Sequence, residues 1–253
     1  MDLKSKQFTF MGSPMHSLTL DETVVFVHDK LKAKEAMQQV VVNVAKLVKM
    51  QKDKELYDSV VTSDLINVDG MGVVLGAKLC GHPVPERVAG IDVMMYLLDL
   101  CNKEGYKPYF LGAKQEVLDE ALDAVRLGYP DINIAGSRHG YFTEEDEGGI
   151  VKEIARTKAD MLFIGITSPI KERFMARHKK DLNTPFIMGV GGSLDILAGK
   201  TKRAPRWMQK HGMEWLYRIY QEPRRMWKRY AVTNSLFALM LIREFFAPKK
   251  DIF

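Results

Sequence analysis

The stretch KPYFLGAKQEVLDEALDAVRLGYPDINIAGS, residues 107–137, decides the fold class of this chain. An apolar run at 107–112 has the length of a buried strand and ends at a glycine. The segment 113–130 then has the apolar spacing of an amphipathic helix and ends with glycine and proline. A second apolar run follows at 132–137. Strand, helix and strand in this order predict two parallel strands joined by a crossover helix.

The same alternation continues on both sides of this unit. We predict further strands at 38–43, 63–68, 160–166 and 185–190, and helices at 44–61, 71–81, 90–105, 143–158 and 171–182. In one of these helices, Asp92 is expected to cap the start and Gly105 the end. The strands are nearly continuous apolar runs, as in a parallel sheet with helices on both faces. The sequence therefore predicts an α/β protein with a Rossmann-like, mostly parallel sheet.

The composition excludes several classes of protein. Among 253 residues, 46% are hydrophobic and 27% charged, as in an ordinary globular protein. Cys80 and Cys101 lack metal or redox spacing and are expected to be reduced thiols. Residues 1–18 lack the apolar core of a signal peptide, and no stretch reaches the roughly 20 apolar residues of a spanning helix. We therefore expect a cytoplasmic protein.

The basic charge is concentrated at the C-terminus. Residues 200–253 hold 13 Lys and Arg against 4 Asp and Glu, whereas residues 1–199 hold 24 against 28. We therefore predict a core at 1–199 and a basic helical appendage at 200–253. Its interleaved basic and aromatic residues precede an apolar run at 236–246, a pattern typical of a helix in the membrane interface.

Two alternatives for this appendage stay open. It could pack as a terminal helix on the core or on another subunit of a homo-oligomer. Basic and aromatic stretches also bind RNA or single strands. No recognition fold accompanies the stretch, so we expect an anionic membrane surface as partner and no nucleic acid.

Polar and glycine-rich turns follow the predicted strands. They include Asn43, Asp69-Gly70 and the sequence MGVGGSLD at 188–195. Because the carboxyl ends of parallel strands share one edge, we expect these turns to line one cleft, with helix starts that can face an anion. Residues 188–195 are the best candidate for a phosphate cradle, although such turns are equally often packing devices. Asp69 is either the cap of the helix from Met71 or a catalytic base.

Seven segments then occur in an order that closely resembles one family, the WecG/TagA/CpsF glycosyltransferases, glycosyltransferase family 26. They are NVDGMGVV, PERVAGID, YFLGAKQEVLDEA, GYFTEED, GITSPIKE, MGVGGSLDILAGKTKRAP and MEWLYRIYQEPRR, within residues 20–230. The resemblance implies an inverting transferase that moves a sugar from a UDP-sugar to a polyprenyl-diphosphate-linked saccharide at the cytoplasmic membrane face. Its products are intermediates of wall polymers, capsules or exopolysaccharides. No metal or other cofactor is implied, and the sequence has no D-x-D pair.

The resemblance also implies roles for single residues. Asp69 stands where the family has its proposed base, and Arg87 stands where an arginine can hold a diphosphate. The remaining residues expected to contact the donor are Asn43, Lys171, Glu172, Gly191, Gly192 and Asp195. The appendage is expected to close over the site, with Arg206, Arg218, Arg224 and Arg225 reaching the diphosphates of donor and lipid.

Two positions depart from the family pattern. Val41 replaces a frequent threonine, and Lys171 replaces a usual glutamine, where it could neutralise the leaving diphosphate. These departures leave the donor open among N-acetylmannosamine, its uronate and a hexose. They also keep a second function open, namely a nucleotide-sugar binding protein without catalysis. A dehydrogenase is disfavoured, because the chain lacks the complete dinucleotide fingerprint.

Overall fold

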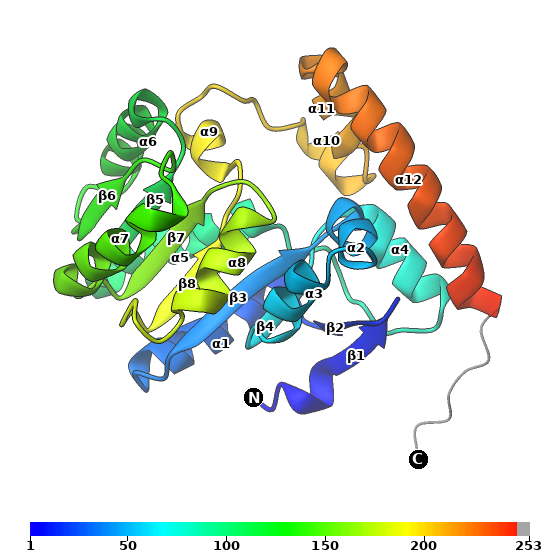
Figure 1. Ribbon diagram of the computed structural model, residues 1–253, viewed down its shortest axis with the longest axis horizontal. Coiled ribbons are helices and arrows are strands. Elements are labelled where there is room, and N and C mark those ends of the chain that lie inside the picture. The colour runs from blue at the N-terminus through cyan, green and yellow to red at the C-terminus, as the bar shows by residue number, and fades with distance from the viewer. Residues whose placement is uncertain (247–253) are drawn as a thin grey trace.

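A computed structural model describes residues 1–246 of the chain. Their strands form one eight-stranded sheet with helices around it (Figure 1). The strand order is β1-β2-β4-β3-β8-β7-β5-β6, and neighbouring strands are parallel except for the β1–β2 hairpin. The strands are β1 (Gln7–Phe10), β2 (Ser13–His16), β3 (Met37–Val42), β4 (Leu65–Val68), β5 (Pro108–Gly112), β6 (Gly136–Arg138), β7 (Met161–Gly165) and β8 (Phe186–Gly189). The predicted α/β class with a Rossmann-like sheet is confirmed.

Helices cover both faces of this sheet. In chain order the helices are α1 (Leu20–Lys32), α2 (Val44–Met50), α3 (Lys54–Val61), α4 (Met71–Leu79), α5 (Gly90–Glu104), α6 (Gln115–Gly128), α7 (Glu144–Thr157), α8 (Ile170–His178), α9 (Ser193–Leu197) and, in the appendage, α10 (Arg206–Lys210), α11 (Glu214–Gln221) and α12 (Pro223–Phe246), with a 3-10 turn at Lys4–Lys6.

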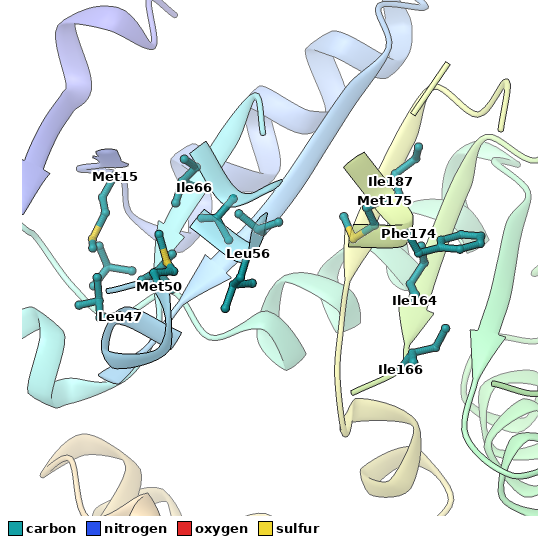
Figure 2. Close-up of a cluster of buried hydrophobic side chains, with 14 of the residues drawn as sticks. Met15, Leu47, Met50, Leu56, Ile66, Ile164, Ile166, Phe174, Met175 and Ile187 are labelled. Atoms are coloured by element: carbon teal, nitrogen blue, oxygen red, sulfur yellow. The ribbon is translucent and has the colours of Figure 1, made fainter. Parts of the chain in front are cut away.

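The two faces have separate apolar cores because side chains alternate along each strand. In β7, Met161 and Phe163 join the core under α1, α5 and α6, whereas Leu162 and Ile164 join the core under α2, α3, α7 and α8. Figure 2 shows part of the second core, where Leu47 of α2 and Leu56 of α3 lie on one side and Phe174 of α8 on the other. Burial on both faces explains why the strands are uninterrupted apolar runs.

Several predicted boundaries are wrong for local reasons. The predicted helix 44–61 is two helices, because the side chain of Asp53 accepts a hydrogen bond from Leu56 N (2.9 Å) and starts α3. The strand predicted at 132–137 is only β6, three residues long. Asp92 does not cap α5; Ala89 occupies that position, and Asp92 forms a bidentate ion pair with Arg203. Gly105 does end α5, in the left-handed conformation.

The appendage packs against the core along one side of its longest helix (Figure 1). Phe237 of α12 is 7% exposed and lies over α4, where a Cβ at Gly76 would come within 3.2 Å of its ring. Other apolar side chains of α12 are more than half exposed: Trp227, Val232, Leu239, Ile242, Phe245 and Phe246. Within residues 1–246, no helix combines the length and apolar character needed to cross a membrane. Residues 247–253 of the predicted appendage lie outside the described residues.

Candidate active site

Asp69 follows β4 at the carboxyl edge of the sheet. Its backbone N–H donates to Val42 O at the end of β3 (2.8 Å), so the ends of both strands are fixed side by side. Gly70, with a positive φ of 99°, occupies the N-cap position of α4, and no side chain caps that helix. A Cβ at Gly70 would lie 3.6 Å from Cβ of Asn43. Asp69 therefore does not cap this helix, and its carboxylate has no hydrogen-bond partner among the side chains that the structure describes.

The partly buried carboxylate of Asp69 lies in a field of charges from separate segments. Burial raises the pKa of Asp69 above its usual value, and the negative charge of Glu214 raises it further. Arg87, Arg218 and Lys46 act in the opposite direction. A carboxylate that holds a proton more readily than usual suits a general base, because it takes up the proton of an acceptor hydroxyl more readily.

Arg87 lies beside this carboxylate. The N–H of the next residue, Val88, donates to Val68 O (2.8 Å) and ties the loop before α5 to the end of β4. The Arg87 guanidinium forms an ion pair with Glu214 of α11, and the two side chains are 16% and 17% exposed. Residues 127 positions apart in the sequence thus meet at the site.

A second group of charges is buried between α2 and α8. Glu172 is fully buried, and its Oε1 lies 2.7 Å from Nζ of Lys171 and 2.8 Å from Nζ of Lys46. Lys46 Nζ also donates to Val41 O (2.6 Å), and its backbone N–H donates to Oδ1 of Asn43, which caps α2 (3.0 Å). These contacts tie the predicted donor residues Asn43, Lys171 and Glu172 into one network.

Burial and the neighbouring charges shift the pKa values of both Lys171 and Glu172. Burial lowers the pKa of Lys171 to about 8, and the neighbouring Lys46 lowers it as well, against the attraction of Glu172. Burial works against ionisation of Glu172, yet the two ammonium groups hold its pKa far below the usual range. The ammonium group of Lys171 is therefore already paired with a carboxylate inside the protein, and the network keeps one surplus positive charge.

The glycine-rich turn after β8 meets the appendage. Gly191 has a positive φ of 55°, and Gly192 precedes α9. A cavity of about 100 Å³ lies here. Its lining comes from the turn side (Gly192, Asp195, Ile196 and Thr201) and from the appendage (Arg218, Gln221, Glu222 and Met226). A larger cavity of about 340 Å³ lies at the opposite edge of the sheet, where β3 begins.

The four predicted arginines of the appendage differ in position. Arg218 lines the cavity and acts electrostatically on Asp69. Arg206 at the start of α10 and Arg224 at the start of α12 are exposed, and neither lines this cavity. Arg225 lies in the same turn of α12, and its side chain is outside the described part of the structure.

Three residues near the site were not identified from the sequence. Lys46 is a buried residue of α2, and a lysine in an apolar segment of the sequence could have indicated a buried charge. Glu214 is an acidic residue in a basic segment, which was a signal as well. Tyr230 of α12 packs on Trp215 (ring centroids 6.0 Å apart); burial raises its pKa, and the charge of Asp69 reaches it. Within residues 1–246, no group of three or more His, Cys, Asp or Glu side chains is placed to hold a metal ion.

Comparison with known proteins gives a consistent set of relatives. Residues 8–251 match the family described as "Glycosyl transferase WecG/TagA/CpsF family". A protein of Bacillus subtilis (strain 168), named N-acetylglucosaminyldiphosphoundecaprenol N-acetyl-beta-D-mannosaminyltransferase, is 35% identical over 193 residues, which cover 76% of this chain and 74% of that one. Proteins with the same name from Bacillus spizizenii and Staphylococcus aureus (strain MW2) are 35% and 36% identical, over 68% of this chain and 66% and 65% of theirs.

Proposed function

Since this chain belongs to the WecG/TagA/CpsF family of glycosyl transferases, we propose that it transfers a sugar from a UDP-sugar to a polyprenyl-diphosphate-linked saccharide, with inversion and without a metal ion. The product is an intermediate of a wall polymer, capsule or exopolysaccharide. The observation that carries this proposal is the partly buried carboxylate of Asp69, which does not cap α4 and lies near Arg87 and Arg218 at the carboxyl edge of the sheet.

Asp69 acts as the general base of the transfer. It takes the proton of an acceptor hydroxyl while that oxygen forms a bond to the anomeric carbon of the donor sugar. The bond from this carbon to the diphosphate oxygen breaks on the opposite face, so the configuration inverts and UDP leaves. The raised pKa of Asp69 supports this role, because a stronger base drives proton removal better.

Cationic side chains stabilise the leaving diphosphate. Arg87 can bind two phosphate oxygens with its planar guanidinium, and Arg218 approaches from the appendage. The turn with Gly191 and Gly192, next to Asp195, binds the nucleotide. Lys171 contributes through the surplus charge of its network with Lys46 and Glu172, since its ammonium is paired within the protein.

The names of the relatives favour particular substrates. They support N-acetylmannosamine or a close analogue as the donor sugar and an N-acetylglucosaminyl-diphosphate lipid as the acceptor. Because such an acceptor is membrane-linked, we place the protein on the cytoplasmic face of the membrane. The exposed apolar side chains of α12 and the neighbouring Lys228 and Arg229 supply an interfacial surface.

A transfer assay in EDTA tests this function. Wild type, Asp69→Asn and the control Asp58→Asn, which alters an exposed carboxylate paired with Lys54, are given a polyprenyl-diphosphate-N-acetylglucosamine analogue and several UDP-sugars. We expect one donor to give product, with a loss of about a hundredfold or more in Asp69→Asn and none in Asp58→Asn. Equal activity of both variants would refute the role of Asp69. UDP-sugar binding without product in wild type would favour the binding-protein alternative.

A further inference from the structure

Glu214 stands out as a carboxylate in a basic segment. It is the first residue of α11, and the appendage around it carries 13 basic residues against 4 acidic ones. Its side chain does not face solvent but meets the guanidinium of Arg87, with both groups more than four-fifths buried. The carboxylate of Glu214 therefore pairs with Arg87, the same guanidinium that the proposed function assigns to the donor diphosphate.

A carboxylate and a phosphate use the same donors of an arginine. Both place two oxygens against the planar N–H fork, so they compete for one guanidinium. The space beside Arg218 is also small, since the cavity there measures about 100 Å³ and pockets for ligands of this size span roughly 300–1,000 Å³. Binding of a donor diphosphate to Arg87 therefore requires that this guanidinium release Glu214.

Building on the proposed function, we propose that Glu214 holds Arg87 in the place of the donor diphosphate, so that donor binding and release of this carboxylate are one exchange. Glu214 is a positioning residue in this scheme. It keeps the guanidinium at the site before the donor arrives, and its release frees the start of α11 to move.

The exchange of partners at Arg87 also affects the pKa of Asp69. The charged and titratable groups around Asp69 are Arg87 from the loop before α5, Lys46 from α2, Glu214 and Arg218 from α11, and Tyr230 from α12. Glu214 raises the pKa of Asp69 because it is a like charge, and Arg87 lowers it. Removal of the Glu214 charge therefore lowers the pKa of Asp69, and the acid limb of the pH profile of kcat/KM shifts to lower pH.

The test compares Glu214→Gln with Glu120→Gln, which removes a different ion pair between appendage and core, that of Lys200 with Glu120 (2.7 Å). UDP affinity is measured by calorimetry without acceptor. We expect Glu214→Gln to bind UDP about fivefold more tightly than wild type, because a competitor for Arg87 is lost. In Arg87→Gln this gain should vanish, since the competition needs the guanidinium. Glu120→Gln should bind UDP as wild type does.

A purely structural role of Glu214 gives different results. The appendage would loosen, UDP affinity would fall or stay unchanged, and the acid limb of kcat/KM would not move; any of these would overturn the inference. The thermal midpoint of each variant shows whether it is folded. Should Glu214→Gln unfold, Glu214→Asp takes its place, because it keeps the charge but shortens the reach to Arg87, and it should also bind UDP more tightly than wild type. Wild type that binds no UDP or UDP-sugar would refute the proposed function itself.

Discussion

The buried Lys171 makes a quantitative prediction about stability. Its pKa is lowered from 10.5 to about 8 in the folded protein, chiefly by burial. One pKa unit corresponds to about 1.4 kcal/mol, so this shift costs about 3 kcal/mol of folding free energy when lysine is protonated in both states. The cost is fully present below pH 8 and disappears as the pH rises from 8 towards 10.5, because the folded state then binds fewer protons than the unfolded one.

Replacement by glutamine, the residue that the family resemblance leads us to expect at this position, removes that cost. We expect Lys171→Gln to be more stable than wild type at pH 7, by up to about 3 kcal/mol. The gain is an upper bound, since Glu172 then depends on Lys46 alone for its positive partner. The gain should shrink as the pH rises to 10.

Urea unfolding at pH 7 and pH 10 measures both differences. Lys54→Gln is the matched control, because that lysine is 87% exposed and pairs only with Asp58 one helical turn away. Because Lys54 is exposed, its replacement does not remove a buried charge, and we expect no gain in stability at pH 7. If Lys171→Gln and Lys54→Gln show the same pH dependence, the buried lysine does not carry this cost and the reasoning fails.

Three further predictions concern packing, capping and the membrane. Gly148→Ala should stabilise the protein by about 0.5–1 kcal/mol, since nothing lies within 4 Å of an added Cβ. Gly76→Ala should lose that gain, because its Cβ would crowd against α12. Urea unfolding measures the stability of both variants, and proteolysis shows whether the appendage has loosened. Asn43→Ala should destabilise by about 1 kcal/mol through loss of its cap on α2, measured by thermal unfolding. Trp227→Ser and Leu239→Ser should each weaken sedimentation with anionic vesicles while the thermal midpoint stays within a few degrees, and unchanged binding would argue against α12 as the membrane surface.

The sequence predicted those parts of the fold whose signals are local. The unit from β5 to α6 combines an apolar run, a glycine turn and a helical spacing within residues 107–130, and it formed as expected. Helix α1 also had a local signal, the reciprocal cap of Thr19 and Glu22, which went unused. The β1–β2 hairpin had none, because its four-residue strands depend on a distant partner, with His16 beside Asn67 of β4.

The site divides in the same way. Asp69 and Gly192 lie at strand ends, where the topology alone brings them to one edge. The pairing of Arg87 with Glu214 depends on how the appendage folds back over the core, and no periodicity within either segment encodes it. The roles of Arg206 and Arg224 as site residues remain predictions, since both side chains point to solvent in the arrangement described.

Helix α12 ties one end of the site to the other end of the molecule. Its 24 residues form a rod of about 36 Å, which starts beside the glycine-rich turn and finishes where Glu244 Oε1 accepts a hydrogen bond from Met11 N (3.3 Å) in the N-terminal hairpin. A stiff rod acts as a lever, so a small tilt at the cleft becomes a larger sweep at its far tip. A pair of fluorescent labels on the hairpin and on the distal turn of α12 would therefore report events at the cleft from the far end of the helix.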